Sequence, residues 1–224
     1  MMDFNCGISF LITRVISRGL WALAFWVGLT CFGPNAVMAQ DTEAIRSINE
    51  LRQGTLIVRF PTQKAKIDTL TALVARSSDP RQKQAFEKEL QETLAERDSL
   101  IAEYTWAFKN KYQFSKAAYF FDYDAHDLNT ARYYNFDGER IAVGDISEKP
   151  LYYLYFDRTE ENKMDALIIY NRFLKKVPRP FPNDFTTGGI NVLFLKLAGK
   201  KMPTWRVEKI NKRLFAFWDT YKTE

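Results

Sequence analysis

The segment Pro80–Lys111 constrains the fold of this chain more than any other part of the sequence. Its apolar side chains recur at intervals of three, four or six to eight residues, which is the spacing of one helix face. Asp79 followed by Pro80 predicts where the helix begins, because Asp accepts hydrogen bonds from first-turn amides and proline suits the first helical position. Such a helix is about 50 Å long at 1.5 Å per residue, whereas a typical strand covers about 17–20 Å. The helix must therefore bend, break or extend beyond the sheet on which it packs.

Apolar segments before and after this helix predict the strands of that sheet. Thr55–Phe60 is β-branched and apolar, so we expect a buried strand that Pro61 ends. Thr62 is placed to cap a shorter helix whose apolar face includes Leu70 and Leu73, and the two helices then form an αα-hairpin. Further strands are expected at 117–123, 151–157 and 166–171, the last two as a β-hairpin, and an amphipathic helix is expected at 204–221.

This order of elements predicts an α/β or α+β fold in a single domain. We expect a mixed sheet, with the long αα-hairpin after its first strand and the C-terminal helix packed on it. The segment 124–144 is polar and irregular, with a tight turn at Asp137-Gly138, and 190–197 fits a strand or a short helix. The order also fits a thioredoxin-type topology, although without a Cys-x-x-Cys motif such a relative has no redox chemistry.

Residues 1–39 have the pattern of a secretory signal peptide. Arg14 and Arg18 supply positive charge, 19–32 is an apolar stretch shorter than a membrane span, and Val37-Met38-Ala39 fits a cleavage site. The mature domain then comprises 40–224, has no transmembrane segment and is exported to the periplasm or the extracellular space. Two alternatives remain open, an uncleaved N-terminal anchor and a lipoprotein modified at Cys31.

Composition argues against several classes of function. Both cysteines, Cys6 and Cys31, lie in the predicted leader, so the mature domain has no disulfide, no thiol catalysis and no cysteine zinc site. His126 is the single histidine and thus the only imidazole base for a catalytic triad. The net charge of +5 includes no run of five or six like charges, so we expect no nucleic-acid partner. The sequence has no nucleotide-binding loop, and we expect no cofactor.

Three short patterns resemble an uncharacterised family of exported bacterial proteins. They are the opening Gly54-Thr-Leu-Ile-Val-Arg-Phe-Pro-Thr62, the aromatic strand Tyr119-Phe120-Phe121, and Arg179-Pro180-Phe181-Pro182. The resemblance covers most of the mature domain and implies export and a shared fold. It implies no activity and no catalytic residue. Asn183 departs from the aromatic residue that follows the last pattern in the family.

The end of the first strand is a candidate anion site. Strand carboxyl ends and helix N-termini attract anions in α/β folds, and Arg59, Lys64 and Lys66 would add positive charge beside Thr62. Pro61 removes one backbone donor, and the sequence has no glycine-rich loop there. The alternative is an ordinary helix cap with solvated lysines.

A second candidate is a divalent-metal site at the ends of two other strands. On a strand, Asp122 and Asp124 would share one face, and His126 and Asp157 could approach the same position. Carboxylates are preferred ligands of Mg²⁺, Ca²⁺ and Mn²⁺, and such a site would support hydrolysis. The alternative is a polar turn whose Asp side chains bond to the local backbone.

Tyrosines at 151–157 suggest a binding surface. Alternation sends Tyr152, Leu154 and Phe156 to one face of the strand and Tyr153 and Tyr155 to the other. The second face either offers rings to a partner protein or a glycan, or is buried as well. We therefore expect a non-enzymatic binding or structural protein of the bacterial envelope, with a divalent-metal-dependent hydrolase as the alternative.

Overall fold

The structure is a computed structural model that describes residues 34–124, 128, 130–147, 150–189, 192, 195 and 197–222. The chain divides into two compact units, Met1–Thr42 and Glu43–Glu224. Helix α2, Pro34–Gln53, continues from the first unit into the second. Most of the predicted signal peptide, with Cys6 and Cys31, lies outside the described residues, as do His126 and most of 190–197. Among the described residues, no helix has the length and apolar character that a membrane span requires.

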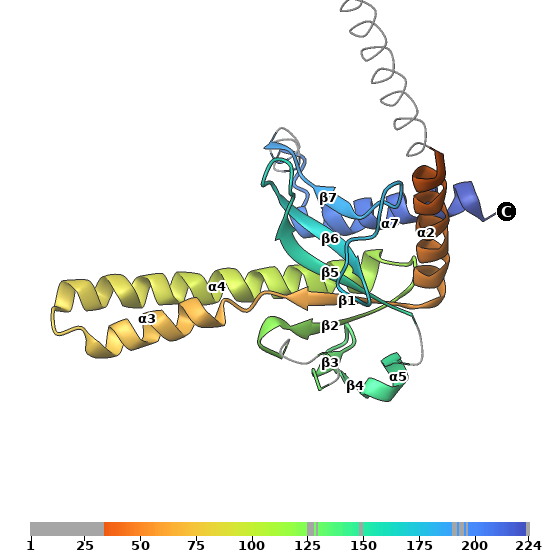
Figure 1. Ribbon diagram of the computed structural model, residues 1–224. Helices are drawn as coiled ribbons and strands as arrows, with labels where there is room; N and C mark the ends of the chain where they lie inside the picture. The colour runs from red at the N-terminus through yellow and green to blue at the C-terminus, as the bar shows by residue number, and fades with distance from the viewer. Residues whose placement is uncertain are drawn as a thin grey trace, which may run out of the picture. The chain divides into compact units, whose positions relative to one another are not determined.

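The second unit contains a mixed sheet, as the sequence predicts (Figure 1). Its described strands follow the order β4-β3-β2-β1-β5-β6-β7. The centre is parallel and consists of β2 (Lys116–Phe121), β1 (Thr55–Phe60) and β5 (Leu151–Arg158). The antiparallel strands on one side are β6 (Asp165–Asn171) and β7 (Asp184–Thr186), and those on the other side are β3 (Tyr133–Tyr134) and β4 (Arg140–Ile141). The fold is α+β.

The long helix has the predicted bounds and extends beyond the sheet. Helix α4 covers Pro80–Lys111, and the Asp79 side chain accepts a hydrogen bond from the Arg81 amide. Its C-terminal part packs on the sheet through Tyr104, Ala107 and Phe108. The N-terminal part runs beside α3, Lys64–Arg76, away from the strands (Figure 1). The length of this helix required it to bend, break or extend beyond the sheet, and the structure shows that it extends beyond the sheet.

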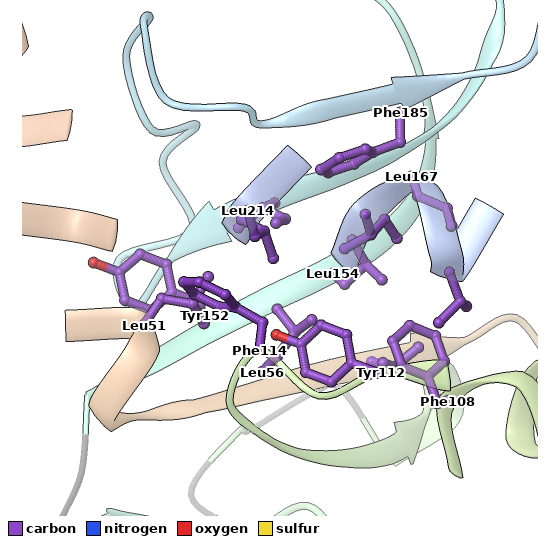
Figure 2. Packing of buried hydrophobic residues seen from close by; sticks show 14 of the residues in the cluster. Leu51, Leu56, Phe108, Tyr112, Phe114, Tyr152, Leu154, Leu167, Phe185 and Leu214 are labelled. Atoms are coloured by element: carbon purple, nitrogen blue, oxygen red, sulfur yellow. The ribbon is translucent and has the colours of Figure 1, made fainter. Parts of the chain in front are cut away.

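Both faces of the sheet are covered. On the first face, α2, α4 and α7 (Met202–Tyr221) surround Leu154 and the other residues labelled in Figure 2. On the second face, Ile57, Phe120 and Tyr153 pack with Ile146 of α5, Val143–Ser147. Burial on two sides explains why the central strands read as nearly continuous apolar runs.

Several local predictions are corrected by the structure. Thr62 does not cap α3, because Gln63 is the residue before its first turn and the Thr62 hydroxyl bonds elsewhere. Leu73, predicted on the apolar face of α3, is 38% exposed. The second strand ends at Phe121, and Asp122–Asp124 form a short 3-10 helix, so these two aspartates do not alternate along a strand.

The thioredoxin-type alternative agrees with the structure in strand order but differs in one strand direction. The order β6-β5-β1-β2 is the expected one, but β5 runs parallel to β1. In a thioredoxin-type sheet the first strand of the hairpin is antiparallel to that neighbour. Parallel pairing of β5 with β1 requires a long crossover connection that brings the chain back to the end of the sheet where β1 starts. The segment between β2 and β5, which contains β3, β4 and α5, is long enough for this.

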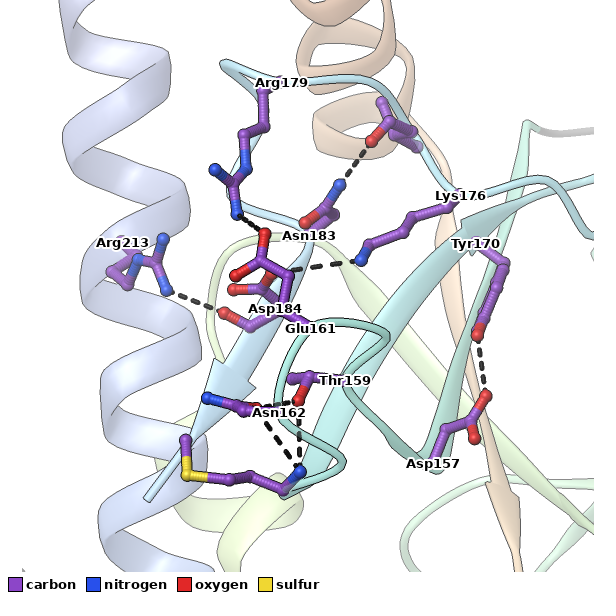
Figure 3. Close-up of polar contacts among 12 residues, drawn as sticks. Asp157, Thr159, Glu161, Asn162, Tyr170, Lys176, Arg179, Asn183, Asp184 and Arg213 are labelled. Atoms are coloured by element: carbon purple, nitrogen blue, oxygen red, sulfur yellow. Dashed lines mark hydrogen bonds and ion pairs between the residues drawn. The ribbon is translucent and has the colours of Figure 1, made fainter. Parts of the chain in front are cut away.

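The C-terminal helix also closes one edge of the sheet. Lys209 donates through Nζ to the Thr186 carbonyl at 2.8 Å. Arg213 donates through Nη1 to the Asp184 carbonyl at 2.7 Å (Figure 3). Both acceptors belong to β7, the outermost strand on this side. Helix α7 therefore binds the edge of the sheet as well as its face.

Candidate functional site

The candidate residues gather where the three parallel strands end. Arg59 is near the end of β1, Asp122 follows β2, and Asp157 is near the end of β5. The connection from β1 to β2 and the connection from β2 to β5 place their helices on opposite faces of the sheet. Helix α4, in the first connection, covers the first face, and α5, in the second connection, covers the second face. In open α/β sheets, ligands bind outside the carboxyl ends of strands at such a change of side.

The strands separate at this edge. The pairing of β1 with β2 continues to Phe60 and Phe121, but the pairing with β5 ends one residue earlier, at Arg59 and Tyr155. Strand β5 continues to Arg158, paired there with β6 alone. A small pocket of about 150 Å³ lies here, lined by Arg59, Pro61, Asp122, Tyr155 and Phe156. We call it the Arg59 pocket.

Arg59 has the least satisfied side chain of the predicted anion site. Its guanidinium carbon lies 5.0 Å from the centre of the Tyr155 ring, which is a cation–π distance. Its Nε atom is buried and has no hydrogen-bond partner among the described residues. Burial raises the pKa of Tyr155, and the charge of Arg59 partly opposes that rise.

The other three residues of the predicted anion site do not join Arg59. The Thr62 hydroxyl donates to Oδ1 of Asp122. Lys64 pairs with Asp68 at 2.7 Å, and Lys66 pairs with Glu89 of α4 at 3.2 Å. The two lysines are therefore neutralised by carboxylates on the helical hairpin, and the predicted four-residue site is not assembled.

The predicted metal site is not assembled among the described residues either. Asp124 forms an ion pair with Arg132 at 2.9 Å. Asp157 accepts a hydrogen bond from the Tyr170 hydroxyl at 2.7 Å (Figure 3). Burial and this carboxylate together raise the pKa of Tyr170. No group of three or more potential metal-binding side chains occurs in the part of the chain that the structure describes, which leaves out His126.

The predicted tyrosine surface, formed by Tyr153 and Tyr155, is mostly buried. Tyr153 is 3% exposed and packs in the second core, so it is not a surface for a partner. Tyr155 is partly buried between Arg59 and Tyr170, whose ring centre lies 5.4 Å away. The predicted alternation of the strand is confirmed, and the two-sided burial that the sequence left open is the outcome for Tyr153.

A larger hollow lies where the helical hairpin leaves the sheet. It has a volume of about 660 Å³, and we call it the hairpin-root groove. Its apolar lining includes Ile67 of α3, Ile101 of α4 and the stacked rings of Phe121 and Tyr123, 5.5 Å apart. Its polar lining consists of Thr62, Lys64, Asp68, Arg97 and Asp98.

Sequence reasoning missed this groove because three distant segments form it. The one signal in the sequence was the length of α4, which required a place where the hairpin leaves the sheet. The groove and the Arg59 pocket meet at a single hydrogen bond, since Thr62 lines the groove and its partner Asp122 lines the pocket.

Comparison with protein-family models, curated proteins and solved structures finds no match to this chain.

Proposed function

We propose that this chain is an exported protein of the bacterial envelope that binds a partner protein and has no catalytic role. The observation that carries the proposal is the hairpin-root groove. A volume of about 660 Å³ is in the range of ligand-binding clefts. The groove combines apolar and aromatic lining with charged side chains of both signs, which is the composition of a protein-binding surface.

The helical hairpin supports a binding role. The buried residues of α4 on the sheet lie in its last eight positions, Tyr104, Ala107 and Phe108, and Thr93 is the other buried residue of this helix. The projecting part of the hairpin therefore adds little to the core of the domain. It offers two long, mostly polar helix surfaces that continue from the groove, so a partner seated there could extend along them.

The groove is a better candidate than the alternatives that the sequence suggested. A glycan is a weaker alternative, because Tyr153 is buried and Tyr155 is the one partly exposed ring of the predicted tyrosine surface. Hydrolysis with a divalent metal is also a weaker alternative, because Asp122, Asp124 and Asp157 are each held by a neighbouring side chain.

Site-specific photo-crosslinking in producing cells tests the groove. A benzoylphenylalanine at Tyr123, which is 38% exposed in the groove, should give one discrete adduct. The same probe at Lys175, exposed in the loop after β6, should not give it. Ile67→Glu, which places a charge in the apolar lining, should abolish the adduct without changing the thermal unfolding temperature. Equal adducts from both positions, or none from Tyr123, would overturn the proposal.

Export rests on the pattern of residues 1–39 and on the family resemblance. The α2 residues that pack in the described core, Ala44, Ile48 and Leu51, all follow Ala39, so cleavage there would leave these contacts in place. Mass spectrometry of the native product should find a chain that begins at Gln40 in the exported fraction. A membrane-bound product that keeps residues 1–39 would support the anchor instead. An intact chain in the soluble cytosol would refute export.

A further inference from the structure

The Arg59 pocket contains a charged group whose hydrogen bonding is incomplete. A buried donor without a partner costs about 1–3 kcal/mol, and more when the group is charged. Nε of Arg59 is such a donor, and no ion pair joins Arg59 to a carboxylate among the described residues. Buried polar groups in native proteins are nearly always paired. Arg59 also lines the pocket, so a ligand there meets a guanidinium that no described carboxylate neutralises.

The guanidinium is held in place before any ligand arrives. Its central carbon lies 5.0 Å from the centre of the Tyr155 ring, the Tyr155 ring contacts Tyr170, and the Tyr170 hydroxyl donates to Asp157. Contacts run from the guanidinium to a carboxylate at the end of β5, and all four side chains come from three adjacent strands. Because the strands fix their backbones, little conformational entropy remains to be lost when a ligand binds.

The opposite charge is supplied by Asp122. Its Oδ1 accepts the hydrogen bond from Thr62, the one partner that the described residues supply to this carboxylate. The second oxygen, Oδ2, is left for a donor from the pocket. A ligand here meets a cation and an anion across a space of about 150 Å³, which is the volume of about five water molecules.

We propose that the Arg59 pocket binds a small zwitterion of the α-amino-acid type, whose carboxylate pairs with Arg59 and whose ammonium group pairs with Asp122. The two charges of the pocket match the two charges of such a molecule, whereas phosphate would be repelled by Asp122. The pocket of about 150 Å³ has room for a compact amino acid. The inference does not depend on the proposed function, because the hairpin-root groove has a different lining.

Titration of the mature chain with small probes tests this assignment. Glycine, L-alanine and L-serine are compared with acetate, methylamine and inorganic phosphate, each of which has only one kind of charge. Binding is measured by isothermal titration calorimetry and by the Nε–H signal of Arg59 in ¹H–¹⁵N spectra, assigned by its loss in Arg59→Lys. Arg59→Gln and Asp122→Asn each remove one charge, and Lys175→Gln, in the exposed loop after β6, is the matched control outside the pocket.

At least one amino acid should bind and shift the Arg59 signal. Acetate, methylamine and phosphate should bind to the wild type at least about tenfold more weakly than the amino acid does. The amino acid should also bind at least about tenfold more weakly to either pocket variant, since a hydrogen bond to a charged group contributes about 1.5–3 kcal/mol. Lys175→Gln should bind as the wild type does. If Arg59→Gln does not fold, Asp122→Asn and the Arg59 signal of the wild type decide.

Three results would overturn the proposal. The first is that no amino acid binds below about 50 mM, which corresponds to less than about 2 kcal/mol. The second is that acetate or phosphate binds as tightly as the best amino acid, which would leave a simple anion site. The third is that Asp122→Asn binds the amino acid unchanged.

Discussion

Gly54 lies where α2 ends and β1 begins, and replacing it by alanine should destabilise the domain. An added Cβ would lie 2.2 Å from the Pro150 carbonyl oxygen and 2.8 Å from that of Glu50, whereas ordinary contact begins near 3.4 Å. Both obstacles are backbone atoms, so no side chain can rotate away. The Pro150 carbonyl also accepts a hydrogen bond from the Thr55 amide at 3.0 Å. Moving Pro150 away by more than 1 Å would break this bond, which links the start of β5 to β1.

The expected loss is the sum of two effects. Overpacking in a close-packed site costs about 1–3 kcal/mol, and a lost backbone hydrogen bond costs about 0.5–1.5 kcal/mol. Gly54→Ala should therefore lower the free energy of unfolding by about 2–4 kcal/mol, or the midpoint of thermal unfolding by roughly 5–15 °C for a domain of this size.

Urea denaturation of the mature chain, followed by circular dichroism, measures this loss. Gly144→Ala is the control, because a Cβ at Gly144 in α5 meets nothing within 4 Å. Alanine is the better helix former, so the control should be neutral or slightly stabilising. A Gly54→Ala protein within about 0.5 kcal/mol of the wild type would show that the close approach to Pro150 is wrong.

Three further predictions concern the core, the tyrosines and the hairpin. Leu214→Ala empties a fully buried position in the first core and should cost about 2–5 kcal/mol in urea denaturation, whereas Ala216→Ser on the exposed side of α7 should be neutral. Burial raises the pKa of Tyr104, Tyr112 and Tyr153, so these groups stay protonated in the folded state when the unfolded chain ionises. The contribution of these tyrosines to stability should therefore be constant below pH 10 and be lost above it. Absorbance at 295 nm should rise together with unfolding, and full ionisation before unfolding contradicts this. Amides of 80–90 should exchange with solvent at least about tenfold faster than those of 104–108, where α4 is buried on the sheet, and equal protection would mean that the hairpin is more stable than its packing implies.

The elements that the sequence predicted well are those with a strong local pattern. The bounds of α4 follow from Asp79 and Pro80 at one end and from the apolar repeat along its length. The alternation in β5 placed Tyr152 and Leu154 correctly on the first face. The turn at Asp137-Gly138 occurs between β3 and β4, where Gly138 has a φ of 87° that favours glycine.

Most of the features that the sequence did not predict depend on contacts between distant segments. Thr62 has the right chemistry for a helix cap, but Asp122, sixty residues away, takes its hydroxyl. Lys66 reads as a free charge because its partner, Glu89, becomes a neighbour only when the hairpin forms, whereas Lys64 pairs with Asp68 one turn later in the same helix. Strands β3 and β4 have two residues each, too few for a period of two to be visible. The burial of Tyr153 could not be predicted without knowing that α5 covers the second face of the sheet.

The bonds from Lys209 and Arg213 to the carbonyls of β7 limit how this protein can associate with others. An incoming strand would have to displace both cations from Thr186 and Asp184 before it could hydrogen-bond to that edge, and the strand at the far edge, β4, is only two residues long. At the β7 edge, the described residues therefore oppose strand addition, which is how exposed edges lead to fibrils and domain-swapped dimers. We expect a partner at this edge to bind through side chains and not as an added strand.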